Sequence, residues 1–393
     1  MVTQPNAMAP RKRRPTKPID APQTLIGRVL DERYRLERVL NAGGMGIIFE
    51  ATQLNVSRRV AVKLLKPTLT SDPALIKRFS LEVELVASLT HPNIVALIDS
   101  GQDPSGLTYL VMEFVEGMTF REALKHTQLT LSEIVDVFAQ TSNALIETHA
   151  RGIIHRDLKF DNIMLVRMRD GRLQIKLLDF GVAKLLSRDG NLTLGGQVAG
   201  TPGIIAPELV DGELPGPRSD LYSMGVLLFT ALSGNPPFKA ANDLELMRAH
   251  KTLALPSLKQ LVGSTVPEEL IELASELLEK DPKRRPADAR LVRDRLELMG
   301  RGLRKRFPDQ SPYRPSVAGP LFFDEEPLIV SEASLAFDDE DERASEPELI
   351  RRVFKEPVIA PFSIVAALSL VLMLLVVIII YTLYSMWVMG QPV

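Results

Sequence analysis

The chain carries the stretch HRDLKFDN at His155–Asn162, and every other interpretation of the sequence starts from it. Asp157 can accept a hydrogen bond from a substrate hydroxyl and orient it for attack. Lys159 can neutralise charge on a transferring phosphoryl group, and Asn162 can offer a neutral oxygen to Mg²⁺. A lone aspartate is most often a surface turn residue, so the spacing of the three residues carries the argument.

A second acidic motif, Asp179-Phe180-Gly181, begins 17 residues after Asn162 (179 minus 162) and follows the apolar strand predicted for Ile175–Leu178. Asp179 supplies a carboxylate, which Mg²⁺ prefers as a ligand, and Gly181 gives the turn conformational freedom. Asn162 and Asp179 are therefore the predicted metal ligands.

A glycine-rich loop lies near the start of the folded region, at Leu40–Ile48, with the sequence LNAGGMGII. Its glycines let backbone N–H groups approach phosphate oxygens closely. The predicted strand Val60–Lys63 follows, and its last residue can direct one ammonium group at the α- and β-phosphates. The predicted phosphate-binding residues are Gly43, Gly44, Gly46 and Lys63.

Lys63 requires an anionic partner to hold it in place. Residues Pro73–Leu89 show the apolar periodicity of a helix, and this helix carries Glu82 and Glu84. Helical register alone does not choose between the two carboxylates.

In this order, the motifs resemble the eukaryotic-like (Hanks-type) Ser/Thr protein kinases, and the loop around Met45 is most similar to their bacterial membrane branch. The resemblance covers Tyr34–Leu298 and includes the triplet Ala206-Pro207-Glu208. It implies an α+β fold, namely the bilobal protein kinase fold with a β-rich N-lobe and a helical C-lobe.

The resemblance also assigns an adenine pocket and chooses Glu82 as the partner of Lys63. Met112 is the expected gatekeeper. In the hinge, the Glu113 carbonyl and the Val115 amide are expected to bind the adenine edge. The residues expected to enclose the ring are Leu40, Ile48, Ala61 and Met164.

Structural and substrate-selecting residues follow from the same resemblance. Asp220 is expected to brace the catalytic loop, and Arg285 to pair with Glu208. Lys159, two residues after Asp157, and Thr201 are typical of Ser/Thr rather than tyrosine kinases.

The activation segment is expected between Asp179 and Glu208. Arg156 could bind a phosphate on this segment and so order it. Thr193 is the predicted phosphorylation site, with Ser187 as the weaker candidate.

Three positions depart from the family pattern. Asn41 replaces the first glycine of the loop, and asparagine tolerates a left-handed backbone better than most residues. Phe160 stands where proline is usual, and Ile204 or Ile205 replaces a common tyrosine after Thr201. None of these changes removes a charge that the chemistry needs.

Composition separates the remaining regions. We expect a basic disordered tail at residues 1–33, the kinase domain at 34–298 and a flexible acidic juxtamembrane linker at 299–357. Residues Val358–Met389 contain no charged residue, and a span of about 20 apolar residues suffices to cross a bilayer. One C-terminal transmembrane helix at 358–389 is predicted, with 390–393 as a short external tail. Basic residues just before the span favour a cytoplasmic kinase domain at the plasma (inner) membrane, with lipid as a partner.

The net charge of −2 does not favour nucleic acid as a partner, and the absence of cysteine excludes disulfides and thiolate metal sites. The predicted function is transfer of the γ-phosphoryl group of ATP to Ser or Thr of proteins, including the chain itself through self-association. The expected cofactors are ATP and Mg²⁺, or Mn²⁺ in its place. A pseudokinase scaffold is the rival interpretation, but pseudokinases commonly lose at least one of Lys63, Asp157, Asn162 and Asp179.

Overall fold

The computed structural model describes residues 22–43, 46–66, 83–126, 128–179, 193–194, 197–198, 201–306, 311–315 and 322. The chain divides into two compact units, Met1–Phe337 and Asp338–Val393, and all described residues lie in the first.

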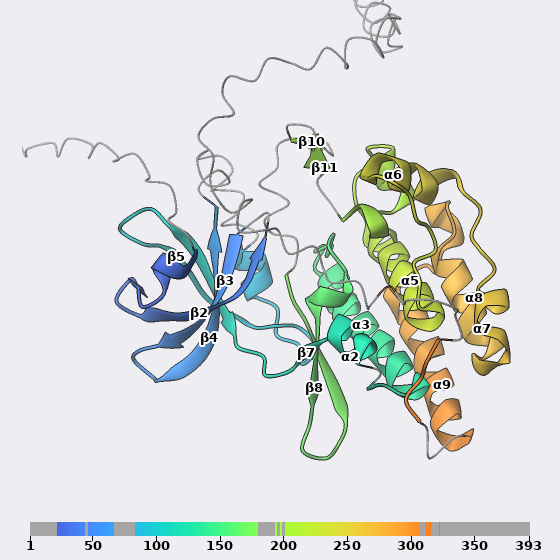
Figure 1. Cartoon of the computed structure of the whole chain (residues 1–393), viewed down its shortest axis with the longest axis horizontal. Coiled ribbons are helices and arrows are strands. Elements are labelled where there is room, and N and C mark those ends of the chain that lie inside the picture. The colour runs from blue at the N-terminus through green and yellow to red at the C-terminus, as the bar shows by residue number, and fades with distance from the viewer. Residues whose placement is uncertain are drawn as a thin grey trace, which may run out of the picture. The chain divides into compact units, whose positions relative to one another are not determined.

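The first lobe is built on one six-stranded sheet with the strand order β1-β2-β3-β4-β6-β5 (Figure 1). All of its described strand pairs are antiparallel. The 3₁₀ helix η1 (Pro22–Leu25) precedes the strands, which are β1 (Val29–Leu30), β2 (Tyr34–Gly43), β3 (Gly46–Gln53), β4 (Arg58–Leu65), β5 (Leu97–Gln102) and β6 (Thr108–Glu113).

Alternation along β4 shows why this sheet forms. Val60, Val62 and Leu64 are buried, whereas Ala61 and Lys63 between them are half-buried on the opposite face. Successive side chains of a strand point to opposite faces, so one face of β4 contributes to the core while the other carries Lys63. Leu30, Phe49 and Tyr109 also belong to this core, which is separate from the core of the second lobe.

The second lobe is mainly helical (Figure 1). Most residues of its helix α5 (Pro217–Ser233) are buried. The α-helices of this lobe are α2 (Phe120–Lys125), α3 (Leu131–Ala150), α4 (Pro207–Val210), α5 (Pro217–Ser233), α6 (Asp243–Thr252), α7 (Leu258–Val262), α8 (Glu268–Leu277) and α9 (Ala289–Arg306). The 3₁₀ helices are η3 (Phe160–Asn162), η6 (Pro202–Ile204), η7 (Gly263–Thr265) and η8 (Pro282–Arg284).

Helix α5 packs closely enough against α8 to require a glycine at the crossing. A Cβ atom at Gly225 would lie 2.7 Å from Cβ of Leu277. The helix ends at Gly234, whose φ of 79° is the left-handed conformation that commonly terminates helices.

A small three-stranded sheet in the order β7-β8-β9 carries the segment between the two candidate catalytic motifs. It comprises β7 (Met118–Thr119), β8 (Ile163–Arg167) and β9 (Leu173–Leu177), and a separate short pair joins β10 (Thr193–Leu194) to β11 (Gln197–Val198). Because β8 follows Asn162 and β9 precedes Asp179, pairing of the two strands brings the motifs to the same end of the sheet.

The expected two-lobed α+β architecture is confirmed, and the structure describes further packed residues on both sides of the predicted kinase domain at 34–298. Residues 22–33 are ordered where a tail was expected, because Leu25 and Leu30 pack into the first core. At the other end α9 continues to Arg306, and Tyr313 and Phe322 pack against the second core. Hydrophobic residues within otherwise polar segments explain both extensions.

The predicted membrane span at 358–389 lies outside the described residues. Among the helices that the structure describes, none combines the length and the apolar composition needed to cross a bilayer.

Candidate active site

The first candidate catalytic residue, Lys63, extends from β4 to the second acidic motif. Its Nζ donates a hydrogen bond of 2.8 Å to Oδ1 of Asp179, and the two side chains are largely shielded from solvent. Glu82, the predicted partner, lies outside the described residues, and the alternative Glu84 is exposed. The described partner of Lys63 is therefore the predicted metal ligand itself.

The loop at 155–162 brings the expected catalytic groups around one carboxylate. Asn162 Nδ2 donates to the backbone oxygen of Asp157 at 2.8 Å and to its Oδ2 at 3.2 Å. Lys159 Nζ lies 3.3 Å from the same Oδ2. Thr201 Oγ1 donates to Asp157 Oδ1 at 3.1 Å, so this threonine lies beside the predicted catalytic carboxylate.

Asp220 braces the loop at 155–162 by hydrogen bonds, as expected. Its buried carboxylate accepts the backbone N–H of His155 at 2.8 Å and that of Arg156 at 2.9 Å. His149 Nε2 lies 2.8 Å from Oδ2 of the same group. Burial alone would raise the pKa of Asp220, but the hydrogen bond and charge of His149, with the contributions of His155, lower it overall.

The loop also holds the strand that leads to Asp179. Leu178 donates its N–H to the backbone oxygen of Asn162 at 2.8 Å, and its own carbonyl lies 2.9 Å from His155 Nε2. Arg156 and Asp179 have φ values of 63° and 49°, a region that non-glycine residues rarely adopt. The hydrogen bonds of the neighbouring residues hold the backbone in this conformation.

The glycine loop is described at its two ends, Gly43 and Gly46; Gly44 lies outside the described residues. A Cβ atom at Gly46 would lie 2.1 Å from the carbonyl oxygen of Leu64, so only glycine fits there. Asn41 pairs with Ile48 within the β2–β3 ladder and is absent from the described residues with positive φ. The left-handed turn considered for Asn41 is therefore not formed.

The expected adenine-pocket residues Leu40, Ile48, Ala61 and Met112 lie on strands of the six-stranded sheet, whereas Met164 lies on β8 and Val115 on no strand. Ala61 pairs with Met112 across β4 and β6, and Asn41, the neighbour of Leu40, pairs with Ile48. Leu40 is exposed and Met112 is buried. Ile48, Ala61, Val115 and Met164 are half-buried.

Glu113 has a contact that sequence reasoning missed. Its Oε1 accepts from Lys176 Nζ at 2.6 Å and from the backbone N–H of Ala96 at 2.9 Å. This links the expected hinge to β9, which leads to Asp179. Residues 113 and 176 share no local pattern, so only the fold reveals the pair.

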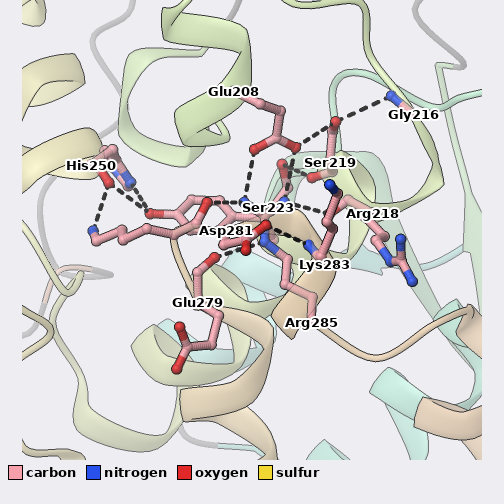
Figure 2. A network of polar contacts seen from close by, with 12 residues as sticks. Glu208, Gly216, Arg218, Ser219, Ser223, His250, Glu279, Asp281, Lys283 and Arg285 are labelled. Atoms are coloured by element: carbon pink, nitrogen blue, oxygen red, sulfur yellow. Dashed lines mark hydrogen bonds and ion pairs between the residues drawn. The ribbon is translucent and has the colours of Figure 1, made fainter.

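The predicted pair of Arg285 and Glu208 is confirmed and is bidentate, at 2.8 and 2.7 Å (Figure 2). Ser219 Oγ also donates to Glu208 Oε1 at 2.8 Å. Burial opposes ionisation of this carboxyl, but the hydrogen bond and charge of Arg285 lower the pKa of Glu208 overall. The pair connects the start of α4 to the residue that follows η8.

Asn162 and Asp179 offer oxygen ligands that suit a divalent cation bound together with the phosphates of the nucleotide. Asn162 donates through Nδ2 and so keeps its amide oxygen as a hard ligand, and Asp179 supplies a carboxylate. Among the described residues no group of three or more His, Asp or Glu side chains could hold a metal ion. Mg²⁺ commonly binds one or two carboxylates together with substrate phosphates and water, which suits this pair.

Thr193 begins β10, where its partner across the strand pair is Val198. Only its backbone belongs to the described structure, and Ser187 lies outside it. Thr193 as a phosphorylation site stays a prediction.

Comparisons with known proteins point to one protein family. The protein kinase domain family model matches residues 34–296. The chain is 33% identical over 294 residues to the serine/threonine-protein kinase pkn3 of Myxococcus xanthus, covering 74% of this chain and 53% of that protein. It is 38% identical over 292 residues to PknA of Mycobacterium tuberculosis (strain ATCC 25618 / H37Rv), covering 73% and 66%.

Among solved structures, the kinase domain of Mycobacterium tuberculosis PknI superposes with a TM-score of 0.55 at 24% identity. The match covers 70% of this chain and 98% of that structure, and it supports the fold alone. The chain spans between about half and two thirds of the length of pkn3 and PknA.

Proposed function

We propose that this chain, which belongs to the protein kinase family, transfers the γ-phosphoryl group of ATP to Ser or Thr hydroxyls of proteins. The observation that carries the proposal is the convergence of Lys159, Asn162 and Thr201 on the carboxylate of Asp157. Such a cluster orients a hydroxyl and offsets negative charge in the same place, which is what phosphoryl transfer requires of a protein.

In the proposed reaction the acceptor hydroxyl oxygen attacks the γ-phosphorus, and the bond from that phosphorus to the β,γ-bridging oxygen breaks, releasing ADP. Asp157 accepts the hydroxyl proton, and Lys159 neutralises charge on the transferring group. Lys63 binds the α- and β-phosphates. Mg²⁺, held by Asn162 and Asp179, would supply charge neutralisation at the phosphates.

Residue type supports Ser or Thr as the acceptor. Lys159 and Thr201 both contact Asp157, so both border the position where the hydroxyl must lie. The family resemblance associates a lysine at this position with Ser/Thr kinases.

The test is transfer of ³²P from labelled ATP by the purified full-length chain, with Mg²⁺, followed by mapping of the labelled residues. Lys63→Met and Asp179→Asn are expected to lower the rate by about 100-fold or more, the usual effect of removing one electrostatic stabiliser of the transition state. Phosphotyrosine as the only product would contradict the acceptor class. No transfer by a folded, ATP-binding chain would favour the scaffold interpretation.

Autophosphorylation at Thr193 and association with a membrane through residues 358–389 belong to the same proposal. The uncharged stretch supports the anchor, and confinement to a membrane would raise the local concentration of the enzyme. Full-length chain should pellet with membranes, and a variant ending before Val358 should not. If that variant still pelleted, the single anchor would be excluded. A rate per molecule that is independent of enzyme density would exclude phosphorylation between copies.

A further inference from the structure

The chain beyond α9 is attached to the carboxyl end of the central helix α5. Tyr313 donates its hydroxyl to the carbonyl of Leu232 at 2.7 Å, and Phe322 donates its N–H to the carbonyl of Gly234 at 2.8 Å. Carbonyls in the last turn of a helix have no partner within the helix. Two described residues from outside the helix therefore satisfy the end of α5.

Tyr313 is also held by a backbone hydrogen bond near the start of α3. Tyr313 donates its N–H to the carbonyl of Leu129, just before α3, at 2.7 Å. Burial raises the pKa of Tyr313 to about 12. Tyr313 and Phe322 also pack against the hydrophobic core of the C-lobe.

Phe322 contacts a cation that is bound to the catalytic loop. The guanidinium of Arg121 lies 5.0 Å from the centre of the Phe322 ring and 5.9 Å from that of Phe160. Arg121 also binds both carboxylate oxygens of Asp161, with Nε at 2.9 and 3.2 Å and a terminal nitrogen at 3.1 Å. Asp161 is the residue directly before Asn162.

Helix α2 is built to hold Arg121 in place. Thr119 caps it, accepting from the N–H of Glu122 at 3.1 Å, while Glu122 accepts the N–H of Thr119 at 2.7 Å. Phe120, next to Arg121, stacks edge-to-face on Phe160 with ring centres 5.3 Å apart. The first turn of α2 therefore contacts η3 in two ways, through the packing of Phe120 on Phe160 and through the ion pair of Arg121 with Asp161.

We propose that Arg121 is a positioning residue for phosphoryl transfer, and that Phe322 adjusts it by packing on its guanidinium. Arg121 fixes Asp161 and thereby the adjacent Asn162, whose amide oxygen is the proposed Mg²⁺ ligand. Tyr313 and Phe322 thus act on the catalytic loop through the side chain of Arg121. This inference rests on the proposed kinase activity.

The test compares full-length variants by kcat, by the apparent KM for Mg²⁺ and by hydrogen exchange of the peptide covering 155–167. Phe322→Leu keeps apolar bulk but removes the ring, and is expected to lower kcat about two- to fivefold, the range for a cation–π contact at a partly exposed site. It should also raise the KM for Mg²⁺ and the exchange of the loop. Phe322→Tyr keeps the ring and should behave as the unmodified chain.

Arg121→Met is expected to lower kcat by about tenfold to 100-fold, because small misplacements of orienting groups cost that much. In this background Phe322→Leu should have no further effect. Arg167→Met is the matched control, since its 2.9 Å ion pair with Glu133 does not touch the loop, and it should change neither kcat nor the KM for Mg²⁺.

Independent, multiplicative effects of Phe322→Leu and Arg121→Met would overturn the proposed connection. So would unchanged kcat and unchanged exchange in Phe322→Leu. If the unmodified chain shows no transfer at all, the proposed function fails instead, and hydrogen exchange still tests whether Phe322 and Arg121 hold the loop.

Discussion

Replacing Arg285 by methionine should be among the most destabilising single changes in the C-lobe. A guanidinium has five N–H donors. Besides two bonds to Glu208, Arg285 donates to the carbonyls of Glu279, Arg218 and Lys280 at 2.8, 2.9 and 3.1 Å. Its charged plane also lies 4.8 Å from the centre of the Tyr222 ring. Methionine has a similar length but satisfies none of these acceptors.

The size of the expected loss of unfolding free energy follows from the burial of Arg285 and Glu208. The Arg285 side chain is 0% exposed and that of Glu208 is 7% exposed. Removing one member of such a pair leaves an uncompensated buried charge and costs about 3–5 kcal/mol of unfolding free energy. For a domain of this size, each kcal/mol lowers Tm by roughly 2–4 °C, so a loss of about 6–20 °C is expected.

The assay is thermal unfolding of Arg285→Met beside Arg290→Met, monitored by circular dichroism. Arg290 pairs with Asp288 at 3.5 Å, but its side chain is 61% exposed, so its loss should cost about 1 kcal/mol or less. Equal Tm values for the two variants would refute the argument from burial.

The pH dependence provides a second check. The pKa of Glu208 is lowered in the folded chain, so its ionised form stabilises the fold above the ordinary value of 4.5. That stabilisation is lost as the pH falls through the lower folded-state value. The Tm difference between the unmodified chain and Glu208→Gln should therefore shrink on acidification.

Three further predictions concern other parts of the C-lobe. Asp220→Asn should leave one buried N–H of the catalytic loop unsatisfied and lower the unfolding free energy by about 1–3 kcal/mol, measured by urea titration. Phe160→Ala should cost about 3–5 kcal/mol by the same measurement, because the ring is fully packed against Phe120. Burial lowers the pKa of Lys280 to about 8 from its ordinary 10.5, so between these values the unfolded chain binds more protons and stability rises with pH. Relative to Lys280→Met, the unmodified chain should gain Tm from about pH 8 to about pH 10, and a flat difference would contradict the buried ammonium.

The sequence was sufficient to predict the residues whose role depends on residue type and order. Asp157, Asn162 and Asp179 are recognisable because their motifs recur at fixed spacing, and the structure places Thr201 and Asp220 against the catalytic loop as expected. The alternation in β4 likewise identified the face that carries Lys63.

Residues that act across long separations could not be predicted in this way. Lys176 and Glu113, or Arg121 and Asp161, meet only after β9 and α2 have packed beside their neighbours. Phe160 appeared as a departure from the family, yet it is buried by aromatic packing on Phe120, which no spacing rule reveals. The packing of Leu25 and Tyr313, which lie outside the predicted kinase domain, was missed for the same reason, since both contact core residues that are distant in sequence.

The anchoring of the site is unequal, and this inequality has a mechanistic consequence. The catalytic loop is held from three sides, by Asp220 of α5, by the backbone of Leu178, and by Arg121 of α2. Among the described residues, Lys63 and Asp179 are by contrast connected by one 2.8 Å contact between β4 and the residue that follows β9 and Leu178. In the proposed reaction Lys63 binds the nucleotide phosphates and Asp179 binds the cation. Binding of the nucleotide and its cation must therefore replace the contact between Lys63 and Asp179 by new contacts. We therefore expect ATP binding to change the Lys63–Asp179 contact rather than the position of Asp157. Within the part of the chain that the structure describes, the loop that carries Asp157 would have to lose several hydrogen bonds to move, whereas Lys63 and Asp179 would lose one.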